Sequence, residues 1–171
     1  MQHPRSVTSM TGTEWLNEEE LDFWRGFIVA GSSVLAEVDA ALKADAGISF
    51  DDYEVLVHLS EADGRRLRMT DLSNRLLHSR NRLTQRIDRM AARGLVRREK
   101  CSSDGRGTFA VMTDDGYDTI RRAAPDHVRA VREHLIDRVG PDRLRSGIEV
   151  FDQIRPSGHW TEELLTDVDP T

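Results

Sequence analysis

The most informative stretch of the chain runs from Thr70 to Gly94 and reads TDLSNRLLHSRNRLTQRIDRMAARG. Thr70 and Ser79 are residue types that cap helix N-termini, and each precedes a segment with apolar residues at helical spacing. The pattern predicts a helix over 71–77 and a second from Ser79 to Arg93, with Gly94 as its C-terminal stop. Two short helices joined by a tight turn indicate a helix-turn-helix. The apolar residues expected in its core are Leu72, Leu76, Leu77, Leu83, Ile87 and Met90.

The polar face of the helix predicted from Ser79 to Arg93 is rich in groups that recognise DNA bases. Arginine can hold guanine, and asparagine or glutamine can hold adenine, through paired hydrogen bonds. A helix of this kind fits the major groove and reads bases mainly from its N-terminal half. Only Asp88 offers an opposite charge within the helix, which favours DNA reading over an ordinary charged surface helix. The predicted base contacts are Arg80, Asn81, Arg82, Gln85 and Arg86, and the further DNA contacts are Thr70, Ser79, Thr84 and Arg89.

A β-hairpin is predicted directly after this helix. Residues 95–101 and 108–113 are rich in β-formers or alternate between polar and apolar, and the residues between them have the composition of a turn. Arg106 lies near the tip, and a narrow minor groove attracts arginine, so we expect Arg106 to contact DNA there. Asp104 either orients Arg106 or only forms the turn. The basic residues of the first strand are Arg97, Arg98 and Lys100.

Helical patterns flank this region on both sides. Apolar residues at steps of three and four predict a long helix near residues 17–45, and a shorter helix begins after Ser49 and ends in a turn at 61–64. Thr113 is predicted to cap a further helix, which Pro125 should kink or split. A Gly-Pro break then precedes a last amphipathic helix. Its apolar residues are Leu144, Ile148, Phe151 and Ile154.

The positive charge of the 171-residue chain is concentrated in one quarter of its length. Although the formal net charge is −6, residues 64–106 contain 13 Lys or Arg against 4 Asp or Glu. The remainder contains 11 basic and 26 acidic residues. A local basic segment is what a phosphate backbone attracts, although charge alone also fits a solvated basic surface.

Several classes of function are disfavoured by what the sequence lacks. It contains no phosphate-binding glycine loop, nucleophile elbow or His-Glu metal motif, so an enzyme is not expected. No cofactor or metal is predicted, because His127 and His134 have no further ligand at a suitable spacing. A single cysteine, Cys101, and the lack of a secretory signal or a membrane-spanning run predict a cytoplasmic protein with no membrane partner.

Several of these segments resemble the MarR family of winged helix-turn-helix regulators in their order and spacing. They are Asp71-Leu72, Ser79, Leu83-Thr84, Asp88-Arg89-Met90, Arg93-Gly94-Leu95-Val96, Asp104-Gly105-Arg106, and Met112-Thr113 with Gly116. The resemblance implies a mainly α fold with a small β-hairpin wing, and a homodimer whose partner is double-stranded DNA. It also implies a transcriptional regulator, usually a repressor, on a pseudo-palindromic operator. Gln85 and Arg86 depart from the family pattern, in which the first is often basic and the second aliphatic.

The resemblance, which covers roughly residues 20–155, also divides the chain into parts. A winged helix-turn-helix DNA-binding domain is expected over residues 48–113. A helical dimerisation region is expected from residues 17–47 together with 114–155. Residues 1–16 and 156–171 are expected to be terminal tails.

Many MarR-like regulators respond to a small aromatic or carboxylic ligand held between these two parts. The candidate ligand-binding residues here are Trp24, Arg25, Phe27, Tyr53 and His58, although each also fits an ordinary core or surface role. One alternative is a redox-responsive regulator that acts through Cys101. Another is a winged-helix interaction module without specific DNA binding, which should have a neutral second helix. An RNA-binding winged helix is disfavoured, because the basic face lacks stacking aromatic residues.

Overall fold

The computed structural model describes residues 13–76, 79–100 and 107–154. The fold is mainly helical, with one small antiparallel sheet, as predicted. Its elements, in chain order, are α1 (Glu18–Ala46), α2 (Phe50–Ser60), η1 (Asp63–Arg65), β1 (Arg66–Arg68), α3 (Met69–Arg75), α4 (Arg80–Ala92), β2 (Val96–Lys100), β3 (Thr108–Met112), α5 (Asp114–Val131), η2 (Arg132–Ile136), α6 (Asp137–Val139) and α7 (Pro141–Ile154).

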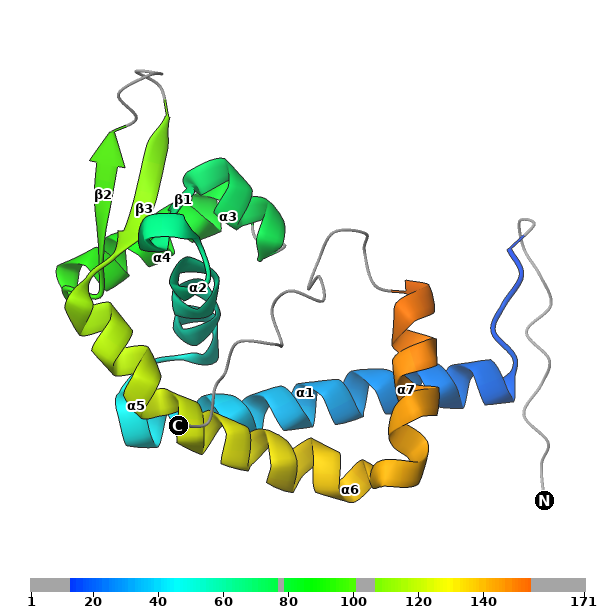
Figure 1. Ribbon diagram of the computed structural model, residues 1–171. Coiled ribbons are helices and arrows are strands. Elements are labelled where there is room, and N and C mark those ends of the chain that lie inside the picture. The colour runs from blue at the N-terminus through cyan, green and yellow to red at the C-terminus, as the bar shows by residue number, and fades with distance from the viewer. Residues whose placement is uncertain (1–12, 77–78, 101–106, 155–171) are drawn as a thin grey trace.

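Two parts of the molecule are distinguishable in Figure 1. A compact lobe contains α2, α3, α4 and the sheet, and the β2–β3 hairpin projects from it. The second part consists of the long helix α1, which lies alongside α5 and its continuation to α6, and of α7 near the beginning of α1. The two parts meet where α1 ends and α2 begins.

Helix α1 is bounded by strong local signals at both ends. Asn17 and Glu20 form a capping box, in which each side chain accepts a hydrogen bond from the backbone N–H of the other. Gly47 ends the helix in the left-handed conformation, with a φ of 66°. Only the C-terminal half of α1 is packed within this chain, where Val38 and Leu42 are buried. The large apolar residues of its N-terminal half, apart from half-buried Leu21, are exposed in the single chain.

The sheet has three strands in the order β1-β3-β2, which corrects the expected two-stranded hairpin. The additional strand, β1, pairs antiparallel with β3, and Arg66 lies opposite Val111. With three residues and only one of them apolar, β1 is too short to give an alternating sequence pattern. Its position is stabilised in part by the Arg66 guanidinium, which lies 4.2 Å from the centre of the Phe109 ring.

The structure differs from two local predictions. Thr70 does not cap α3, which begins at Met69 because β1 leads directly into the helix and puts Arg68 at the N-cap position. Pro125 does not split α5, which continues through it from Asp114 to Val131. Pro125 is exposed, so water can bond the carbonyl group that the missing N–H leaves free. The first irregular turn comes later, in the π-helical η2.

The core of the lobe agrees with the sequence pattern. The five described residues predicted there are all buried, namely Leu72, Leu76, Leu83, Ile87 and Met90. Leu77 lies outside the described residues. No helix in the described part of the chain combines the length and the apolar character needed to cross a membrane.

Candidate nucleic-acid interface

Helix α4 turns its apolar stripe inward and its polar face outward. Leu83, Ile87 and Met90 have no exposed surface, which fixes the rotation of the helix about its axis. At the N-terminus, the Ser79 hydroxyl accepts a hydrogen bond from the Arg82 N–H at 3.4 Å, as its predicted role as a cap requires. Most of the predicted DNA contacts on this helix are therefore exposed, namely Arg80, Asn81, Arg82, Thr84, Gln85 and Arg89.

Arg86 is the exception on α4. Its side chain is only 15% exposed and forms ion pairs with Asp51 and Asp52 at the start of α2. Arg93, two turns further along, reaches the same corner of the molecule and lies 3.3 Å from Asp52. Arg86 was predicted as a base contact from the charges within its own helix alone. The acidic partners of Arg86 are 34 and 35 residues away in sequence, on another helix.

The hairpin is attached to α4 by a residue whose role the sequence pattern did not reveal. Arg98 on β2 donates to the carbonyl oxygen of Thr84 at 3.1 Å and lies 2.9 Å from a carboxylate oxygen of Asp88. The one acidic side chain of α4, Asp88, is thus paired with Arg98, and this contact holds the hairpin against the helix. The basic strand and the lone Asp88 were the available sequence signals for it.

A hollow of about 320 Å³ lies between α3, α4 and the hairpin. Its lining offers hydroxyl groups and guanidinium groups, which are the donors that phosphate oxygens accept. Thr70, although not a helix cap, thus lies beside Thr84 in a position compatible with DNA contact. The lining residues are Arg68, Met69, Thr70, Thr84, Arg98, Gly107 and Thr108. Arg106, Asp104 and Cys101 lie outside the described residues.

The five candidate ligand-binding residues are not brought together. Tyr53 and His58 are buried in the lobe, where the Tyr53 ring lies 4.4 Å from that of His127. Trp24 and Phe27 are exposed on the other part of the molecule, with ring centres 6.1 Å apart, and line a groove of about 800 Å³ that ends at Ile154. Arg25 is exposed on the same helix, outside the residues that line this groove.

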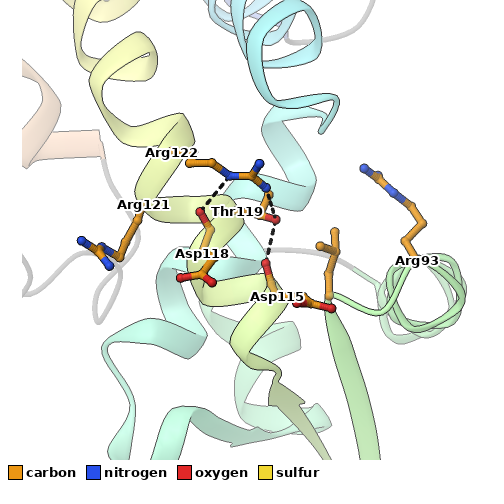
Figure 2. Close-up of a pocket in the computed structure, with 7 residues that line it drawn as sticks. Arg93, Asp115, Asp118, Thr119, Arg121 and Arg122 are labelled. Atoms are coloured by element: carbon orange, nitrogen blue, oxygen red, sulfur yellow. Dashed lines mark hydrogen bonds between the residues drawn. The ribbon is translucent and has the colours of Figure 1, made fainter.

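A charged hollow of about 690 Å³ lies at the beginning of α5 (Figure 2). Arg122 donates to the backbone carbonyl of Asp118 at 3.2 Å and to the Thr119 hydroxyl at 3.4 Å. Thr119 in turn donates to the carbonyl of Asp115 at 2.7 Å. These polar groups are thus engaged with one another along a single helix. Arg93, at the end of α4, lines the opposite side of the hollow.

Glu54 on α2 is a titratable group in an unusual environment near the junction of the two parts. Burial raises the pKa of its carboxyl group to about 7, with a further contribution from the nearby negative charge of Asp51. The positive charge of Arg86 opposes this shift. Near neutral pH the folded protein therefore holds a proton here that an unfolded chain would release.

Replacing Glu54 by glutamine is expected to flatten the pH dependence of stability. Because the folded state holds the proton more tightly, the wild-type free energy of unfolding should fall as pH rises from about 4.5 to about 7. Allowing for solvent screening, the fall attributable to Glu54 is about 1–2 kcal/mol. Urea unfolding between pH 5 and 8 measures it, with Glu149→Gln on exposed α7 as the control. Parallel pH profiles for wild type and Glu54→Gln would contradict the assignment.

A helix-turn-helix whose second helix presents a basic, exposed face beside a β-hairpin defines the winged helix-turn-helix class of DNA-binding proteins. Residues 46–107 match the model of the MarR family. The chain is 41% identical to Sco3205, a MarR family transcriptional regulator from Streptomyces coelicolor, over 84% of this chain and 96% of that one, with a TM-score of 0.78. The protein belongs to the MarR family of DNA-binding transcriptional regulators.

Other solved structures are also similar to this chain. AbsC, a second MarR family regulator from Streptomyces coelicolor, is 40% identical and has a TM-score of 0.78, with 83% of this chain and 95% of that chain covered. A cysteine-to-serine variant of MarR from E. coli, solved with operator DNA, shares the fold at 17% identity and a TM-score of 0.73, with 84% and 100% covered. The structure of Sco3205 is also a complex with DNA. No curated protein matches the chain.

Proposed function

We propose that the protein is a homodimeric repressor that binds a pseudo-palindromic operator. The observation that carries the proposal is the exposed basic face of α4, which Arg98 connects to the wing. In the dimer, two copies of α4 enter successive major grooves about one helical turn apart, and the wings contact the flanking minor grooves through Arg106. The complex of the similar regulator Sco3205 with DNA supports DNA binding by this chain.

The proposed dimer is supported by apolar surface that one chain leaves uncovered. Large apolar side chains are exposed along the first half of α1 and along α7, among them Trp24, Phe27, Ile148 and Phe151. Soluble monomers seldom expose contiguous apolar surface of this kind. A second copy, related by a two-fold axis, would cover the same face on both subunits. The helical dimerisation region is thus proposed as residues 17–47 and 114–155, and the DNA-binding domain as residues 48–113.

Release by a small aromatic or carboxylic ligand also stays a proposal. The five candidate residues do not share a cavity within one chain, and the ligand is proposed to bind at the junction between the two parts, where the Tyr53 ring lies beside His127 of α5. A ligand there would act by favouring a dimer whose two α4 helices no longer match the operator spacing. Redox regulation through Cys101 is the second candidate mode of control.

The proposal is tested by DNA binding at several salt concentrations. The protein is mixed with labelled intergenic DNA from beside its own gene and, separately, with a random duplex of equal length. We expect a clear preference for the intergenic DNA and a steep loss of affinity with salt, because bound arginines displace counterions. Equal affinity for both duplexes would instead support an interaction module without specific DNA binding.

Replacing Arg82 by alanine is expected to cost roughly 1–3 kcal/mol of operator binding and to relax the base preference at one position of each half-site. Arg82 is exposed on the N-terminal half of α4, where base contacts are made. Competition with operators changed one base pair at a time measures both effects. Arg121→Ala on α5 removes an equal charge away from α4 and should bind as the wild type does. A loss that is equal for all sequences would instead place Arg82 on a phosphate.

A further inference from the structure

Arg86 extends from α4 into the corner at which α1 ends and α2 begins. Its Nη1 donates to a carboxylate oxygen of Asp52 at 2.8 Å and to the Ser49 hydroxyl at 3.3 Å. Its Nη2 pairs with Asp51. The side chains of Arg86 and Asp52 are only 15% and 13% exposed. Moving Arg86 into a DNA groove would remove the counter-charge of Asp51 and one of the two cationic partners of the buried Asp52 carboxylate, which is costly.

Arg93 makes a second connection between α4 and the same corner. Its Nη1 lies 3.3 Å from the other carboxylate oxygen of Asp52, and its Nη2 donates to the carbonyl of Gly47 at 2.7 Å. Gly47 is the residue that ends α1, and Ser49 is the residue that caps α2. Helix α4 is therefore fastened to the corner at two points, two turns apart. We call this set the corner bracket, and its members are Gly47, Ser49, Asp51, Asp52, Arg86 and Arg93.

Close packing does not fix α4 against α1 on this side. A hollow of about 840 Å³ lies between them, lined by Leu35, Asp39 and Lys43 from α1 and by Arg86 and Arg89 from α4. The apolar stripe of α4 belongs to the same buried core as Val38 and Leu42 of α1. The corner bracket adds directed polar contacts from α4 to the end of α1 on the side where the hollow separates the two helices.

We propose that Arg86 is a positioning residue that sets the orientation of α4 relative to α1 through the corner bracket and does not contact the bases. The inference rests on the proposed function, in which α1 contributes to the dimer interface and α4 reads DNA. Helix α1, with 29 residues, is about 43 Å long, so a small rotation at its end displaces one α4 from the other by several ångströms. Arg86 thereby affects recognition of the whole operator rather than of one base pair.

The test is a double-mutant cycle with Arg86→Met and Asp52→Asn, separately and together. We expect each single variant to bind the operator about 5- to 50-fold more weakly, while its binding to random duplex and its salt dependence stay unchanged. The double variant should be no weaker than the weaker single one, because both remove the same contact. Arg93→Met should also weaken binding to the operator but not to random duplex, and by less, because the Arg93 side chain is more exposed. This variant tests the proposal if Arg86→Met does not fold.

Three outcomes would overturn the inference. If Arg86→Met changes the preference at one base pair and Asp52→Asn binds as the wild type does, Arg86 reads a base. If Arg86→Met reduces the slope of log affinity against log salt by about one, Arg86 contacts a phosphate. If the losses of the two single variants add in the double variant, the two residues act independently. A wild-type protein that does not prefer the operator would reject the proposed function itself, which separates that failure from the other three.

Discussion

A Gly116→Ala protein is expected to lose about 3 kcal/mol or more of its free energy of unfolding. A β-carbon at Gly116 would lie 2.1 Å from the carbonyl oxygen of Leu95 and 2.9 Å from Cγ of Met112. The nearest obstacle is backbone, so a change of side-chain rotamer cannot relieve the overlap. The beginning of α5 would have to move away from the beginning of β2.

That movement would disrupt the joint among α4, the wing and α5. Thr113 accepts a hydrogen bond from the N–H of Gly116 at 3.0 Å and donates to the carbonyl of Gly94 at 2.6 Å. Its own N–H donates to the carbonyl of Leu95 at 3.2 Å. These bonds link the end of α4 to the first turn of α5, and displacing Gly116 strains all of them. Loss of DNA binding should therefore accompany the loss of stability.

Urea unfolding monitored by circular dichroism measures the effect of Gly116→Ala. Gly26→Ala is the matched control, because outside its own helix backbone no described atom lies within 4 Å of a β-carbon at that position. There alanine should keep or slightly raise stability, since it favours helix more than glycine does. Similar stabilities for the two variants would show that α5 can shift without cost and would contradict the predicted packing.

In the sequence, Gly116 stands out only through the family resemblance, by its spacing from Thr113, and that spacing does not explain why a glycine is needed there. The spacing is a local signal, like the apolar stripe of α4 and the caps at Ser49, Ser79 and Thr113, and such signals predicted most of the described elements. The contact of Gly116 with Leu95 connects two elements and depends on how they pack. Patterns within one element do not contain that information.

Arg86, at the candidate site, is a second residue whose contacts could not be predicted from the pattern of its own helix. Within their own helix, Asp51 and Asp52 are acids in the first turn of α2, where the helix dipole favours negative charge. Their second role as partners of Arg86 requires α4 to lie across the end of α1. The departure of Arg86 from the aliphatic residue common in the family was the one sequence signal. The strand β1 was missed for a related reason, since its pairing with β3 is non-local and its own pattern too short.

Replacing Phe151 by glutamate is expected to convert the proposed dimer into a monomer and to weaken operator binding at least about a hundredfold. Phe151 is 53% exposed on α7, and no residue of α7 is buried within the chain, so the substitution should leave the fold of each subunit intact. In a two-fold interface the introduced charge appears twice in an apolar contact, where it is costly to bury. A monomer presents only one α4 and loses the gain of binding both half-sites together.

Gln153→Glu provides the matched control for this variant. It adds one negative charge to the same helix two residues away, on a different side from Phe151, so it should remain dimeric and bind the operator nearly as the wild type does. Analytical ultracentrifugation measures the mass of each variant, and operator titration measures its affinity. If Phe151→Glu stays dimeric, α7 lies outside the interface. If it becomes monomeric but binds the operator with unchanged affinity, one α4 is sufficient for recognition. That result would reject both the proposed pseudo-palindromic operator and the proposed role of α1 in spacing the two α4 helices.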